Sequence, residues 1–221
     1  MGAYAQYSKM FRNGIIAKAE ELGYSSANVC ILKGDMHALE TNYPETYANL
    51  ISCRHNRDAR TPIEYGRDLV ASWIFEDTLV QKLAEGGLKP SLAGADRDRE
   101  VLATAKVSAS SDCHISDAGK SRYLEIMSDY TGWWERTGHI DLRDSKYKKL
   151  QAENALFLGV CTTSNKFILL DFTTGLGAAY IPAHIPYGGK PAYSIPVKKD
   201  TLKPFSMPSL IGELKRLICA S

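Results

Sequence analysis

Several familiar functional signatures are missing from this 221-residue sequence. It contains no C-x-x-C pair, no G-x-S-x-G nucleophile motif and no Walker phosphate-binding loop. Its five cysteines are dispersed and odd in number, so neither a disulfide framework nor a zinc site is predicted, and we expect a reducing cytoplasm. No apolar run is long enough to span a bilayer, and no signal-peptide pattern is present. These absences argue against a secreted disulfide scaffold, a P-loop enzyme and a serine hydrolase of the G-x-S-x-G type.

The composition is that of an ordinary globular protein, with 44% hydrophobic and 24% charged residues. The length suffices for one sizeable core, or for a core and a small lobe. A formal charge of +2 neither supports nor excludes a polyanionic partner, because a local basic patch can bind DNA on a near-neutral protein.

Periodicity and breaker residues predict a mixed α/β fold, with helices packed on a central mixed sheet. Helices are expected at 4–22, 43–51, 62–85, 141–153 and 210–217, a β-hairpin at 110–129, and strands at 156–161 and 167–172. Four prolines between Pro182 and Pro196 predict a loop-rich region without a central strand. Within one compact domain, we expect an N-terminal helical region with a basic loop (1–61), a core (62–172) and a proline-rich lobe with the last helix (173–221).

The hairpin brings two acidic residues together. Asp117-Ala118-Gly119-Lys120 is a turn signal, and placing the turn there makes the numbers of facing residues sum to 237. Asp112 then faces Glu125, with the two Cβ atoms about 5 Å apart. Two facing carboxylates repel each other unless a cation lies between them, and a divalent metal bound by hard oxygens is the simplest such cation.

A third carboxylate comes from the long helix. Its predicted core stripe is Leu69, Trp73, Glu76, Val80 and Leu83. A charge on that stripe costs several kcal/mol unless it is paired. Glu76 is therefore either an outer carboxylate of a metal site, a side chain that bonds Arg67 or a backbone amide, or a residue at the edge of the stripe. On the hairpin's second strand, Asp129 shares a face with Glu125 and is a further candidate ligand, although both could instead lie on a solvated face.

This order of elements resembles the PD-(D/E)xK nuclease superfamily, in particular type II restriction endonucleases. Glu76 would be the helix carboxylate, Ser111-Asp112 the Pro-Asp element and Glu125-Ile126-Met127 the Glu-x-Lys element, over residues 62–172. The resemblance implies a restriction endonuclease-like core. It also implies a Mg²⁺-dependent deoxyribonuclease that cuts duplex DNA, with Asp112 and Glu125 as metal ligands. A homodimer is expected, because symmetric cutting of both strands needs two sites related by a two-fold axis.

One departure from the family pattern is Met127, which stands where the family has lysine. A thioether neither binds a hard metal well nor accepts a proton from water. One interpretation is that a lysine from another element replaces it: the candidates are Lys106, Lys120, Lys146 and Lys148. The helix that carries Lys146 is preferred because it follows the strand of Glu125. Otherwise metal and phosphate activate the water unaided, or the chain is an inactive DNA-binding or interaction protein. An unrelated α/β protein with surface carboxylates is the third interpretation.

Residues that could contact DNA lie in three places. They are Arg54 and Arg57 in the basic loop, Arg143 and Lys148 near the start of the helix expected at 141–153, and Lys190 beside Gly188-Gly189. Each of these charged side chains could instead simply be solvated, and Gly188-Gly189 could instead be an ordinary tight turn.

Overall fold

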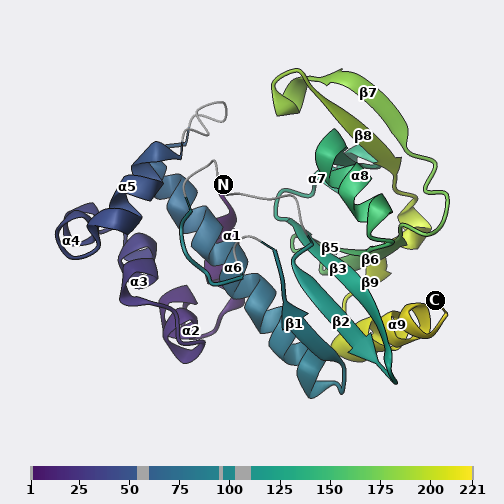
Figure 1. Cartoon of the computed structure of the whole chain (residues 1–221), viewed down its shortest axis with the longest axis horizontal. Coiled ribbons are helices and arrows are strands. Elements are labelled where there is room, and N and C mark those ends of the chain that lie inside the picture. Colours follow the sequence, from purple (N-terminus) through teal and green to yellow (C-terminus); the bar gives the residue numbers. More distant parts are fainter. Residues whose placement is uncertain (1, 54–59, 95–96, 103–110, 221) are drawn as a thin grey trace. The chain divides into compact units, whose positions relative to one another are not determined.

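The computed structural model describes residues 2–53, 60–94, 97–102 and 111–220. They form two compact units, which we describe separately. The first comprises Met1–Gln81 and Ala95–Ser108, and the second comprises Lys82–Gly94 and Ala109–Ser221 (Figure 1). Within the described ranges, no helix is long and apolar enough to cross a membrane.

The described part of the first unit is helical. Its helices are α1 (Ala3–Met10), α2 (Ile15–Glu21), α3 (Ser26–Lys33), α4 (Met36–Asn42), α5 (Pro44–Ser52) and most of α6 (Pro62–Glu85). The single helix expected at 4–22 is wrong, because the chain turns between α1 and α2 at Gly14, whose φ of 85° only glycine adopts easily. The helix expected at 43–51 is confirmed as α5.

The expected start and end of α6 are confirmed. At its start, the Thr61 hydroxyl accepts the Glu64 N–H at 3.4 Å and the Glu64 carboxylate accepts the Thr61 N–H at 2.8 Å, which is a reciprocal capping box. The expected core stripe is shifted, however. The buried positions include Val70, Trp73, Ile74, Leu79 and Leu83, whereas Leu69 and Val80 are half-buried.

The second unit holds a six-stranded sheet in the order β1-β2-β3-β5-β6-β9. Its strands are β1 (Lys89–Leu92), β2 (Cys113–Asp117), β3 (Lys120–Asp129), β5 (Leu156–Cys161), β6 (Lys166–Asp171) and β9 (Lys203–Pro204). The β3–β5 pair is parallel and the other neighbours are antiparallel. The sheet is thus mixed, and the chain has the expected α/β class.

The expected hairpin is confirmed, since Ser116 pairs with Ser121 and Cys113 with Leu124. Both central turn residues have positive φ, 48° at Ala118 and 81° at Gly119, as the tightest hairpin turns require.

The C-terminal half differs from the expectations in two places. The helix expected at 141–153 is confirmed as α8 (Asp144–Ala152), but its first three residues belong to a strand, β4 (His139–Arg143). The proline-rich segment forms β7 (Ala179–His184) and β8 (Lys190–Pro196), and β8 is the central strand of a three-stranded sheet, β4-β8-β7.

This small sheet tolerates its prolines because of where they fall. Pro182 and Pro191 lie within a register shift between β7 and β8, Pro186 lies in the short 3₁₀ turn Ile185–Tyr187, and Pro196 ends β8. At such positions the missing N–H breaks no regular ladder bond. The division of the chain at residues 61 and 172 stays a prediction. In the structure, residues after 172 contribute strands and α9 (Met207–Cys219) to the second unit.

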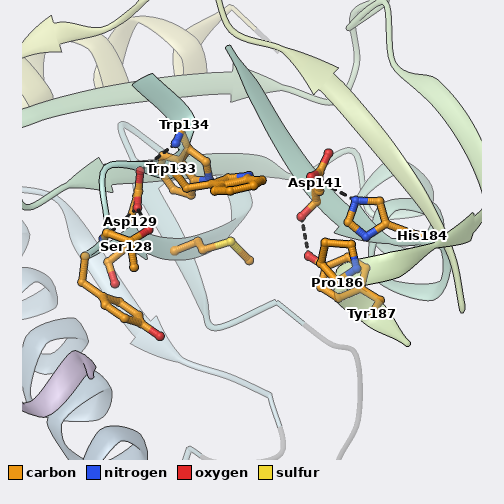
Figure 2. A pocket seen from close by; sticks show the side chains of 11 residues that line it. Ser128, Asp129, Trp133, Trp134, Asp141, His184, Pro186 and Tyr187 are labelled. Carbon is orange, nitrogen blue, oxygen red and sulfur yellow. Dashed lines mark hydrogen bonds and ion pairs between the residues drawn. The ribbon is translucent and has the colours of Figure 1, made fainter. Parts of the chain in front are cut away.

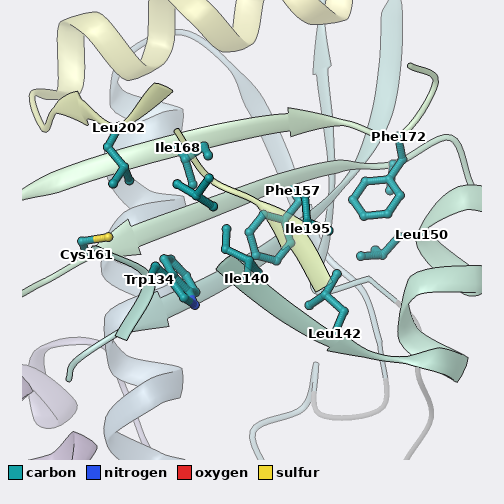
Figure 3. Close-up of a cluster of buried hydrophobic side chains, with 12 residues drawn as sticks. Trp134, Ile140, Leu142, Leu150, Phe157, Cys161, Ile168, Phe172, Ile195 and Leu202 are labelled. Atoms are coloured by element: carbon teal, nitrogen blue, oxygen red, sulfur yellow. The ribbon is translucent and has the colours of Figure 1, made fainter. Parts of the chain in front are cut away.

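The two faces of the large sheet are covered differently. On one face lies the buried cluster in Figure 3, to which the sheet contributes Phe157, Cys161 and Ile168 and the small sheet contributes Ile140 and Ile195. On the other face, α9 contacts β2, β3 and β6 and buries Leu210, Leu214 and Ile218. The face shared with the small sheet is the one that carries the candidate site.

Candidate functional site

Glu125 lies on an interior strand and faces the buried cluster. Its register partner on β5 is Phe157, and Met127 is paired with Gly159 in the same way. Paired residues on adjacent strands share a face, so Glu125 and Met127 point toward the layer that contains Phe157. Glu125 is only 4% exposed, which excludes the solvated-face interpretation for this carboxylate.

Asp112 immediately precedes β2. The observed pairing of Cys113 with Leu124, continued by one residue, places Asp112 opposite Glu125 as the turn predicted. Its Oδ2 accepts the backbone N–H of Ile126 at 2.7 Å, and its carbonyl accepts the N–H of Ala93 at 2.8 Å. These contacts fix the carboxylate beside β3, at the residue that follows Glu125.

Lys146 in the first turn of α8 meets Glu125 directly. Its Nζ donates to Glu125 Oε2 at 2.6 Å, and its side chain is 20% exposed against 5% for that of Glu125. An ammonium group therefore stands against the buried carboxylate from an element other than β3. We call Asp112, Glu125 and Lys146 the lysine site.

The other lysine candidates are placed differently. Lys120 donates to the carbonyl of Cys219 at 2.7 Å, and Lys148 pairs with Asp144 on its own helix at 2.9 Å. Lys106 lies outside the described residues. Met127 is half-buried and packs against the hydrophobic cluster, so its side chain fills space beside the lysine site.

The donors of the lysine site suit a hard divalent cation. Asp112 and Glu125 offer carboxylate oxygens from adjacent strands, and Mg²⁺ characteristically takes one or two protein carboxylates, with water and substrate phosphate completing its six ligands. The described residues contain no group of three or more His, Cys, Asp or Glu side chains arranged to hold a metal. A cation at this place would therefore depend on non-protein ligands for much of its coordination.

Asp129 has a local role that occupies both carboxylate oxygens. Oδ1 accepts the N–H and the hydroxyl of Thr131, both at 2.9 Å, and Oδ2 accepts the N–H of Trp134 at 2.8 Å. It thus shapes the turn from β3 into α7 (Trp133–Thr137). This use explains why a buried acid at the end of β3 need not be a metal ligand.

Glu76 belongs to an ion-pair network within the first unit. Arg99 Nη1 contacts Glu76 Oε2 at 3.1 Å, and Arg99 Nε contacts both oxygens of Asp77 at 3.2 Å. The hydroxyl of Tyr24 also donates to Asp77, at 2.6 Å. We call these four residues the arginine cluster. The partner of Glu76 is thus Arg99, from a loop that helical periodicity does not reveal, and not the expected Arg67.

The arginine cluster is electrostatically tight. Burial by itself lowers the pKa of Arg99, but the hydrogen bond to Asp77 and the charge of Glu76 outweigh it and raise that pKa above its ordinary value. Burial raises the pKa of the Tyr24 hydroxyl, and the neighbouring Asp77 carboxylate raises it further. Arg99 therefore stays charged and the Tyr24 hydroxyl stays neutral across the physiological pH range.

A pocket of about 390 Å³ (Figure 2) is reached from the lysine site through Met127, which lines it and lies two residues from Glu125 on β3. It is lined by Met127, Ser128, Asp129, Tyr130, Thr131, Trp133, Trp134, Asp141, His184, Pro186 and Tyr187. Trp133 and Trp134 lie on one side, and Asp141, His184 and Tyr187 lie on the other. His184 Nε2 contacts Asp141 Oδ2 at 3.1 Å, and the Tyr187 hydroxyl donates to the Asp141 carbonyl at 2.6 Å. Sequence reasoning missed this pocket, because two adjacent tryptophans are more typical of a core or an interface than of a pocket wall.

The candidate DNA-contacting residues of the second unit are exposed. Arg143 ends β4 and its guanidinium carbon lies 5.4 Å from the ring centroid of Tyr187, while Lys190 begins β8. Lys148 lies on α8. Arg54 and Arg57 lie outside the described residues. A role for any of these side chains in DNA binding stays a prediction.

Comparison with known proteins gives a structural match without a sequence match. No family model and no curated protein matches the chain. Among solved structures, the chain is similar to Hjc, a Holliday junction resolvase from the archaeal hyperthermophile Archaeoglobus fulgidus, with 9% identity and a TM-score of 0.36. The match covers 62% of this chain and 98% of Hjc. Because the identity and the TM-score are this low, the proposals below rest on the residues of the chain itself.

Proposed function

We propose that the chain is a Mg²⁺-dependent endonuclease that hydrolyses phosphodiester bonds of duplex DNA, of the type II restriction class and active as a homodimer. The observation that carries this proposal is the contact of Lys146 with Glu125 beside the facing Asp112. Lys146, on α8, would supply the amine that the family's lysine supplies from the position of Met127 on β3.

In this proposal Asp112 and Glu125 hold the divalent cation. The cation, when bound, would lower the pKa of a water molecule and neutralise charge on the phosphate. With Glu125 engaged in this way, the Lys146 ammonium would turn toward the phosphate or the attacking water, where a flexible point charge with three donors can hold either. The hydrophobic cluster on the same face as Glu125 lowers the local dielectric constant, which strengthens the interaction between the two charges.

The test is incubation of supercoiled plasmid with the full chain and Mg²⁺, with Asp112→Ala and Glu125→Ala as variants. We expect nicked, linear or fragmented DNA from the wild type and none from either variant. Mg²⁺ or Mn²⁺ should support cutting, while Ca²⁺ should support binding with little cutting, because it is larger and activates water less well. Cleavage that persists in both variants, or in excess EDTA, contradicts the proposal.

A second candidate function is favoured by Met127 alone: a catalytically inactive DNA-binding protein with the same fold. Under this alternative the wild type binds duplex DNA but cuts none with any divalent metal. Discrete fragments from the plasmid test would exclude it and would also support sequence-specific cleavage of the restriction type.

A further inference from the structure

The pocket beside the lysine site adjoins the proposed cleavage position. Met127 lines the pocket and lies two residues along β3 from Glu125, on the same face of the strand. Side chains at that spacing are about 7 Å apart. A DNA strand whose phosphate reaches Glu125 and Lys146 therefore brings an adjoining nucleotide to the mouth of the pocket.

The lining suits a flat heterocycle with polar edges. Trp133 is 43% exposed, so much of its indole is available for stacking. The Tyr187 ring faces it across the pocket and is held in place by its hydrogen bond to the Asp141 carbonyl. The Asp141 carboxylate and the Thr131 and Ser128 side chains also line the pocket and offer groups that hydrogen-bond base edges. A volume of about 390 Å³ accommodates one nucleotide, at the lower end of the usual range for ligand pockets.

Next to the pocket-lining residues in the chain is an exposed apolar side chain, Ile185. Ile185 is 88% exposed, the most exposed of the large hydrophobic residues that the structure describes. It begins the 3₁₀ turn Ile185–Tyr187 between β7 and β8, and the next two residues, Pro186 and Tyr187, both line the pocket. Proteins that unstack DNA insert such apolar wedges between base steps. Ile185 is placed to fill the position of a base that has moved into the pocket.

The charge around the pocket fits a polyanion. The Arg136 guanidinium carbon lies 5.8 Å from the ring centroid of Trp133, and that of Arg143 lies 5.4 Å from the ring centroid of Tyr187. Both arginines are exposed, so each stacking side chain is accompanied by a cation that can contact a phosphate.

We infer that this pocket receives one unpaired base of the bound DNA while Ile185 enters the stack in its place. The inference rests on the proposed function and specifies its substrate. The preferred duplexes carry a base that is unpaired, or easily unpaired, next to the cleaved bond, because such a base costs least to remove from the stack.

The experiment compares two short fluorescein-labelled duplexes, one fully paired and one with a single-nucleotide bulge, by anisotropy in Ca²⁺. We expect the wild type to bind the bulged duplex about tenfold more tightly, since the cost of unpairing is already met. Trp133→Ala and Ile185→Ser should remove this preference, and Trp133→Phe, which keeps an aromatic face, should retain most of it. Tyr180→Ala is the matched control, because Tyr180 is a 54% exposed aromatic residue on the same small sheet that does not line the pocket.

Equal binding of the two duplexes by the wild type overturns the inference, as does a preference that Trp133→Ala leaves intact. Binding of free nucleoside monophosphates with no effect of the bulge would also overturn it and would make the pocket a small-molecule site. Asp112→Asn should keep the preference while it loses cleavage. If the wild type cuts DNA but shows no preference, the inference alone fails. If it shows the preference but cuts nothing with any metal, the nuclease proposal fails instead.

Discussion

The arginine cluster and the lysine site both combine one positive charge with two acidic side chains, but the cationic residue differs between them. Each sets one cationic side chain against two carboxyl groups: Arg99 with Glu76 and Asp77, and Lys146 with Glu125 beside Asp112. Arginine offers a rigid fork of donors and never loses its proton, so it saturates both carboxylates. Lysine is a movable point charge that a metal ion can displace from a carboxylate. Under the proposed function, the identity of the cation, and not the burial of the acids, separates the structural network from the proposed active site.

The two regions also differ in what the sequence reveals. The facing of Asp112 and Glu125 follows from a turn signal and a period of two, and both were recognisable in the hairpin. The placement of Lys146 was expected only from the order of elements, and the strand β4 before α8 was missed because His139–Arg143 is too short for its alternation to stand out. The Arg99 contact was not predictable, because residues about twenty positions apart met through an irregular loop.

The pocket was beyond sequence reasoning for a similar reason. It needs the small sheet, in which β8 pairs with both β4 and β7, and proline content argued against any such strand. The prolines stand at strand ends, in the turn and at a register shift, and that information resides in the pairing and not in the composition. The sequence patterns thus predicted the large sheet better than the small one.

The largest effect is expected at the lysine site. Lys146→Met should lower the cleavage rate by a factor on the order of 10³, because it removes the charge that acts on the phosphate or the water. Duplex binding in Ca²⁺ should change little. Lys149→Met is the control, since Lys149 is on the same helix, is 44% exposed and pairs with Glu153. The measurement is the single-turnover cleavage rate of both variants. If Lys146→Met cuts as fast as Lys149→Met, Lys146 takes no part in the mechanism.

In the arginine cluster we expect a loss of stability without a loss of cleavage. Arg99→Met leaves the poorly exposed Glu76 and Asp77 without their main cation and should cost about 3 kcal/mol of unfolding free energy. Cleavage per folded molecule should stay at the wild-type level. Urea unfolding monitored by circular dichroism measures the first quantity. A cleavage defect without a stability defect would mean that Glu76 belongs to the active site after all.

A smaller effect, on stability alone, is expected for the ion pair between Arg122 and Asp171 in the second unit. Burial raises the pKa of Asp171, but hydrogen bonds from Arg122 and Thr173 outweigh it and lower that pKa below its ordinary value of 3.8. A carboxyl group with a lowered pKa stabilises the fold above its unfolded pKa, and this contribution is lost as the pH falls through the folded pKa. Asp171→Asn should therefore cost about 2 kcal/mol at pH 7 and less below about pH 4. Parallel pH profiles of the two unfolding curves would contradict this account of the pair.

The smallest effect is expected for Met127→Ala. Because Met127 is half-buried against the hydrophobic cluster, its truncation should cost about 1–2 kcal/mol of stability and lower cleavage less than about tenfold. Met127→Leu, which preserves most of the volume, should behave as the wild type in both assays. Complete loss of cleavage in the folded alanine variant would show that the thioether does more than fill space.

The central claim is that Asp112 and Glu125, and not Glu76, hold the divalent cation. Titration calorimetry with Mn²⁺ on the DNA-free protein addresses it most directly, with Asp112→Asn, Glu125→Gln and Glu76→Gln as the three variants. The account predicts that Mn²⁺ binding is lost in the first two variants and kept in the third. Unchanged binding in Asp112→Asn and Glu125→Gln, or its loss in Glu76→Gln alone, would contradict it.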